Sequence, residues 1–172
     1  MRKLVILLLM GMIMPHLSTS QPKIKIAGDA DAEMVTAQVN RSLDYLDIDE
    51  QMLLFIHFSD RIPASLKGLT LCMPAHDSTQ LFRISIDARL NEAQRLNVLA
   101  HEMIHVRQYL SGDLKVVNGL MIWKGSKYPF THRDPRKLPW EGEAYRYDQY
   151  LANALRETPA ERPPLLASEI EQ

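Results

Sequence analysis

The sequence predicts a single α+β domain in which a small mixed sheet packs on helices. The chain has 172 residues, of which 46% are apolar and 24% charged, as expected for one globular domain rather than a disordered or low-complexity chain. Several segments of strand length are densely apolar or alternate polar and apolar residues. Longer segments between them repeat apolar residues every three or four positions, which is typical of helices that cover one side of a sheet.

The first twenty residues are predicted to be a secretory signal peptide. Arg2 and Lys3 precede the apolar run Leu4–Met14, and small residues precede Gln21. The run has about eleven residues, too few to span a membrane, so we expect no stable membrane span after cleavage. The mature chain would carry 18 basic against 21 acidic side chains and be periplasmic or secreted. With no basic surplus, nucleic acid is not an expected partner.

The amino-terminal half predicts four strands and one helix. Dense apolar runs or period-two alternation mark the strands, and a turn containing Gly28 ends the first of them. Asp29 or Asp31 is a candidate N-cap for a helix from about Ala32 to Leu46. The only cysteine, Cys72, has apolar neighbours and is expected to be buried. The expected strands are Lys23–Ile26, Met52–Phe58, Gly68–Met73 and Phe82–Asp87.

The carboxyl-terminal half predicts two helices separated by a hairpin. The first helix begins after the N-cap Asn91 and runs to about Leu110, with Gly112 as its carboxyl-terminal cap. Residues 114–123 should form two strands joined by a tight turn at Asn118-Gly119, followed by a polar loop to residue 138. Pro139 should lie in the first turn of a helix that runs to about residue 156. Residues 158–172, which contain three prolines, are expected to form a loose tail.

The chemically informative motif is His101-Glu102-Met103-Ile104-His105, within the first of these two helices. Residues four apart lie on one helix face, so both imidazoles can reach the same metal ion while the Glu102 carboxylate lies nearby. Zinc at such a site lowers the pKa of bound water, and the carboxylate can take the proton of that water. The helix has an apolar face, and its polar stripe is expected to line a cleft: Gln94, Asn97, His101, His105 and Gln108.

A catalytic zinc ion usually has three protein ligands, so a third must come from elsewhere in the chain. Glu141 and Glu143 enter the last helix in the segment Pro139-Trp140-Glu141-Gly142-Glu143-Ala144. With this segment, the sequence resembles the zincin metallopeptidases, specifically the gluzincin-like group and small bacterial and phage proteins that pair His-Glu-x-x-His with a later Glu-x-Glu-Ala. The resemblance covers about residues 82–155.

The resemblance implies that His101 and His105 bind Zn²⁺, that Glu102 is the general base, and that Glu143, directly before alanine, is the third ligand. Glu141 remains an alternative, because side chains two residues apart on a helix diverge by roughly 200° and only one can face the metal. His132, in a charged loop, is a further alternative. His57 is expected to be a core or cleft histidine and His76 a turn residue.

Catalysis would also need a donor to the oxyanion, for which Tyr128 is the candidate and Tyr145 and His132 are alternatives. The resemblance further implies that the strand Phe82–Asp87 lines the cleft and pairs with an extended peptide. Residues 21–157 are therefore expected to form a zincin-like domain with a metal-bearing helix and a glutamate-bearing helix. The expected function is exported, zinc-dependent hydrolysis of peptide bonds in a peptide or protein substrate.

Two alternatives from other classes remain. The chain could be a zinc-stabilised binding or structural domain of the cell envelope, although such a site has no need of an acid beside its histidines. It could also be a membrane-anchored assembly factor that retains its leader, which the mature amino terminus would decide.

Overall fold

The computed structural model describes residues 22–73, 79–129 and 137–154, without the side chains of 149, 150 and 152–154. The expected signal peptide, the tail from residue 158, His76 and His132 lie outside the described residues. Within them the chain is an α+β protein with three helices, as the sequence predicts, and its strands form two sheets rather than one sheet and a hairpin. None of the helices in these ranges is long and apolar enough to cross a membrane.

The larger sheet has four strands in the order β1-β2-β4-β3. The first three are parallel and β3 is antiparallel to β4, so the sheet is mixed. All four strands match the predicted segments to within two residues at either end. Their bounds are β1 Lys23–Ala27, β2 Met52–Ser59, β3 Gly68–Met73 and β4 Gln80–Asp87.

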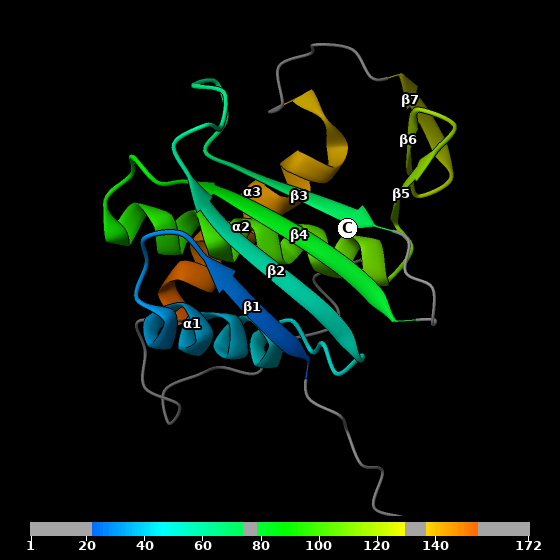
Figure 1. The fold of residues 1–172 in the computed structure, drawn as a ribbon. Helices are drawn as coiled ribbons and strands as arrows, with labels where there is room; N and C mark the ends of the chain where they lie inside the picture. Colours follow the sequence, from blue (N-terminus) through cyan, green and yellow to red (C-terminus); the bar gives the residue numbers. More distant parts are fainter. Residues whose placement is uncertain (1–21, 74–78, 130–136, 155–172) are drawn as a thin grey trace, which may run out of the picture.

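The three helices α1 (Ala32–Tyr45), α2 (Glu92–Leu110) and α3 (Pro139–Ala154) all lie on one face of this sheet (Figure 1). Alternate residues of the central strands point into the core beneath them, including Leu54 of β2 and Ile84 of β4, which are fully buried. Helix α2 packs against β3 and β4 of the sheet and contacts both α1 and α3, which also contact each other. The opposite face carries partly exposed residues such as His57 and Leu71.

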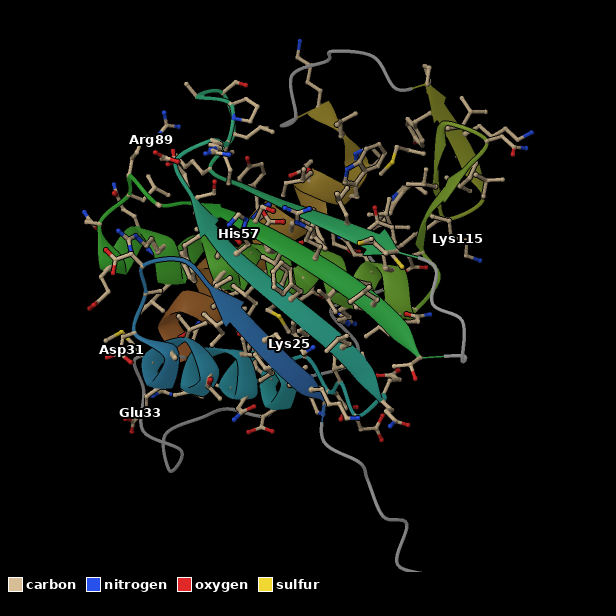
Figure 2. All side chains as sticks on the ribbon, in the orientation of Figure 1. Lys25, Asp31, Glu33, His57, Arg89 and Lys115 are labelled. Atoms are coloured by element: carbon tan, nitrogen blue, oxygen red, sulfur yellow. The ribbon has the colours of Figure 1, made fainter. Side chains whose placement is uncertain are left out.

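Local sequence explains where α1 and α2 begin. Asp31 caps α1 by accepting hydrogen bonds from the amides of Glu33 and Met34, and Figure 2 shows it at the start of this helix. Asn91 and Gln94 form a reciprocal capping box at the start of α2. At the other end of α2, Gly112 has φ +75°, the left-handed conformation that favours glycine after a helix.

The smaller sheet has three antiparallel strands, β5 (Leu114–Val117), β6 (Leu120–Trp123) and β7 (Ser126–Pro129). Asn118 and Gly119 both have positive φ, as a primed hairpin turn requires. The prediction of a continuous polar loop after Trp123 was wrong, because β7 pairs with β6 through a second tight turn. The signal for β7 is weak because its residues are mostly polar, and it is held by the ring contact between Tyr128 and Trp140.

The expected burial of Cys72 was also wrong, since the residue is exposed. Cys72 lies on β3, and this strand pairs on only one side among the described residues. An edge strand leaves its side chains less covered than a central strand does. The apolar neighbours Leu71 and Met73 are likewise exposed, by 44% and 41%.

Candidate metal centre

Helix α2 presents both histidines of the motif to the same point between α2 and α3. The imidazole rings of His101 and His105 lie 4.9 Å apart between centroids and are nearly perpendicular. Leu99, Met103 and Ile104 on the same helix are fully buried against the sheet. This packing fixes the rotation of α2 and turns its histidines toward α3.

Among the described residues, the carboxylate of Glu141 is the one that pairs with both imidazoles. Its two oxygens lie 3.3 Å from Nε2 of His101 and 3.5 Å from Nε2 of His105. One ligand atom from each of these three residues lies within 4.8 Å of the others. Around a tetrahedral zinc ion with bonds of about 2.0–2.1 Å, neighbouring ligand atoms are separated by roughly 3.3–3.4 Å. The described residues therefore fit a metal ion held by two imidazoles and one carboxylate.

Glu143, the expected third ligand, points elsewhere. Its Oε2 accepts a hydrogen bond of 2.8 Å from Nε2 of Gln108, and its Oε1 pairs with Nζ of Lys124 at 3.2 Å. The structure thus brings Glu141, the alternative, to the histidines and leaves Glu143 in a separate hydrogen-bonded group. His132, the other alternative, lies outside the described residues.

Each histidine contacts a further polar side chain at its second nitrogen: Asp148, which the sequence alone does not single out, and Gln108, which was expected only as part of the polar stripe lining a cleft. Nδ1 of His101 lies 3.0 Å from both carboxylate oxygens of Asp148, and Nδ1 of His105 lies 2.8 Å from Oε1 of Gln108. In both rings, the Nε2 atoms therefore face the centre. The available signal was the spacing of Glu141, Tyr145 and Asp148, which share one face of α3 at positions i, i+4 and i+7.

The ionisable groups of the centre shift one another's pKa. Burial by itself lowers the pKa of His101, but hydrogen bonds to Asp148 and Glu141 outweigh it and raise the pKa to about 10. For His105, burial also opposes protonation, yet Glu141 raises its pKa overall. Burial would raise the pKa of Glu141, but the two histidines hold it down to about 2. Without a metal, these groups form an ion-paired cluster; a bound cation would replace the protons of the imidazoles.

Glu102 is a buried carboxylate, 4% exposed, that lies against strand β3. The hydroxyl of Thr70 donates a hydrogen bond of 2.7 Å to its Oε2. Gly68 leaves the space for its other oxygen, because a Cβ atom at Gly68 would overlap Glu102 Oε1. Burial raises the pKa of Glu102, although His105, His101 and Thr70 oppose the shift. A carboxylate with a raised pKa beside two imidazoles is suited to accept and return a proton.

The two expected oxyanion donors within the described residues, Tyr128 and Tyr145, have different ring neighbours. The ring of Tyr145 lies 5.0 Å from that of His101 between centroids. The ring of Tyr128 instead packs edge-on against Trp140 at 5.5 Å, within the small core beneath β5–β7. The role of Tyr128 stays a prediction. His57 stacks on Phe55 and lines a shallow hollow of about 430 Å³ at the carboxyl ends of the parallel strands.

The strand beside the motif is β3 rather than β4. The resemblance implied that Phe82–Asp87, within β4, lines the cleft, but β4 is paired on both sides, with β2 and with β3. Its backbone therefore has no free edge for a peptide. Gly68 and Thr70, which contact Glu102, belong to the edge strand β3.

Comparisons of the chain with family models, with curated proteins and with solved structures gave no match. The site is therefore interpreted from its own residues and geometry.

Proposed function

We propose that this protein is a zinc-dependent peptidase whose metal ligands are His101, His105 and Glu141. The observation that carries the proposal is the convergence of two imidazole Nε2 atoms and one carboxylate next to a buried glutamate, Glu102. Two histidines and one glutamate leave a fourth position open, which is typical of catalytic rather than structural zinc. Glu141 replaces Glu143 as the ligand because Glu143 is bonded to Gln108 and Lys124.

When bound, zinc would supply Lewis acidity toward water and toward the carbonyl of the substrate. The chain would supply the proton transfers. Glu102 would take a proton from the attacking water as its oxygen bonds to the carbonyl carbon, and would deliver that proton to the amine nitrogen as the C–N bond breaks. The burial that raises the pKa of Glu102 favours the protonated form between these two transfers.

The edge strand β3 supports an extended peptide as the substrate. Among the described residues, β3 pairs only with β4, so its other backbone edge is available to a further strand. Thr70 of this strand contacts Glu102 directly, so a peptide paired with β3 would lie beside the general base. The exposed side chains Leu69 and Leu71 alternate with Thr70 and face the opposite side of the sheet.

The test is a paired measurement of metal content and turnover on purified wild type and Glu102→Gln. We expect about one zinc per chain in both proteins, and hydrolysis of a peptide library by the wild type alone. Glu102→Gln retains the size of the side chain but cannot accept a proton. A wild type that binds zinc and hydrolyses no peptide would overturn the proposal in favour of the zinc-stabilised binding domain.

A further inference from the structure

We infer that Gln108 is a positioning residue that orients His105 for the metal, and that Glu143 and Lys124 act through it. The inference rests on the proposed metal centre and extends it to three residues that would not touch the metal. Gln108 is 2% exposed, and its side chain makes three hydrogen bonds that together involve α2 and α3.

The direction of the Gln108 amide follows from its partners. Its NH₂ group donates to the backbone carbonyl of Trp140 at 3.0 Å and to Oε2 of Glu143 at 2.8 Å. Both partners are acceptors, so they require the nitrogen on this side and place the carbonyl oxygen on the other. That oxygen lies 2.8 Å from Nδ1 of His105 and can only accept. His105 must therefore carry hydrogen on Nδ1, so that in the neutral imidazole required for metal binding the lone pair lies on Nε2, the nitrogen directed toward the metal position.

Glu143 and Lys124 complete the arrangement. Lys124 lies in the turn between β6 and β7, and its amino group is 3.2 Å from Oε1 of Glu143. The remaining oxygen of Glu143 is then directed to Gln108. Lys124 also balances the charge of a carboxylate whose side chain is only 13% exposed. The second glutamate of Glu-x-Glu-Ala thus anchors a ligand-orienting amide instead of binding the metal.

The experiment measures zinc affinity by competition with a chromophoric chelator, and the visible spectrum of the Co²⁺-substituted protein. Gln108→Leu removes all three hydrogen bonds at similar volume, and we expect its zinc affinity to fall about 10–100-fold. The matched control is Gln38→Leu, which alters another buried glutamine, on α1. We expect the control to retain the affinity and the Co²⁺ spectrum of the wild type, even where it lowers the melting temperature.

Exchanging the side chains at positions 108 and 143 tests whether Gln108 orients His105 or only fills space in the core. Gln108→Glu still offers an acceptor to His105, but places a second carboxylate against Glu143, so zinc affinity should fall. Adding Glu143→Gln restores a donor opposite the new carboxylate, and the double variant should regain most of the lost affinity. A purely structural role predicts no such recovery.

The outcomes distinguish this inference from the proposed function. Zinc affinity within about twofold of wild type in Gln108→Leu, or no recovery in the double variant, would overturn the inference while leaving the peptidase intact. A wild type that binds zinc without hydrolysing peptides would overturn only the peptidase, since the affinity test would still apply. Absence of zinc binding by the wild type would overturn both.

Discussion

Glu141 and Asp148 contact opposite nitrogens of the same imidazole, that of His101. Glu141 lies 3.3 Å from Nε2 and Asp148 lies 3.0 Å from Nδ1. The two carboxylates are seven residues apart, about two turns of α3, and therefore lie on the same face of the helix. One helix thus provides both the candidate ligand and the group that orients a histidine on the neighbouring helix.

The first prediction separates the two glutamates of α3. Glu141→Gln should abolish or strongly weaken zinc binding, because a neutral amide replaces the carboxylate that faces both histidines. Glu143→Gln should retain about one zinc per chain at lower affinity, because that residue acts through Gln108. Elemental analysis after gel filtration, together with chelator competition, measures both effects. Loss of zinc in Glu143→Gln alone would show that Glu143 is the ligand.

The second prediction concerns Gly68. In Gly68→Ala, the added Cβ would overlap Glu102 Oε1 and lie 2.6 Å from Cγ1 of Val98, so these two side chains of α2 must shift away from β3. We expect a loss of about 1–3 kcal/mol in the free energy of unfolding, and reduced turnover because Glu102 moves. Urea denaturation measures the first effect.

Gly142→Ala is the matched control for this substitution. Gly142 lies inside α3, and an added Cβ meets nothing within 4 Å. Alanine is the better helix former, so this variant should gain up to about 1 kcal/mol. Equal stability changes in the two variants would refute the proposed crowding at Gly68.

The third prediction is that the free energy of unfolding depends on pH through Asp87 and Arg89. Both lie at the carboxyl end of β4, where Figure 2 shows Arg89. Hydrogen bonds from Arg89 hold the pKa of Asp87 below its usual value. The folded state therefore favours charged Asp87, and this stabilisation is fully present above the unfolded pKa of about 4. It is lost as the pH falls through the lower folded pKa.

Arg89→Met removes this effect and provides its test. Relative to wild type, the variant should be destabilised at neutral pH, and the difference should shrink as the pH falls below about 4. Urea denaturation between pH 2 and 7 measures it. Arg83→Met, which alters an exposed arginine on the same strand, is the control. A difference for Arg89→Met that is constant with pH would contradict the assignment.

The fourth prediction uses the exposure of Cys72. Because the thiol is accessible, a chromogenic disulfide reagent should titrate one thiol per native chain without denaturant. Partial burial raises the pKa of this thiol, so its reaction near pH 8 should be slower than that of a small-molecule thiol. Cys72→Ser should give no reaction. A thiol that reacts only in denaturant would instead support the burial that its apolar neighbours suggest.

The sequence by itself determined the features that depend on near neighbours in the chain. The alternation of polar and apolar residues predicts the strands. The capping residues Asp31 and Asn91 predict where α1 and α2 begin, and Asn118-Gly119 predicts the turn of the hairpin. The convergence of His101 and His105 was also predictable, because the i, i+4 spacing fixes it within one helix. The strand β7 was missed because its residues carry little local preference.

Only the tertiary structure decided which carboxylate faces the histidines. Trp140, Ala144 and Leu151 form the buried stripe of α3, and their packing sets the rotation of this helix about its axis. Glu141 and Glu143 flank that stripe on opposite sides, since each residue adds about 100°. The rotation therefore directs Glu141 to His101 and His105, and Glu143 to Gln108 and Lys124. The spacing of the two glutamates along the chain does not predict this rotation of α3, because contacts with residues distant in the sequence determine it.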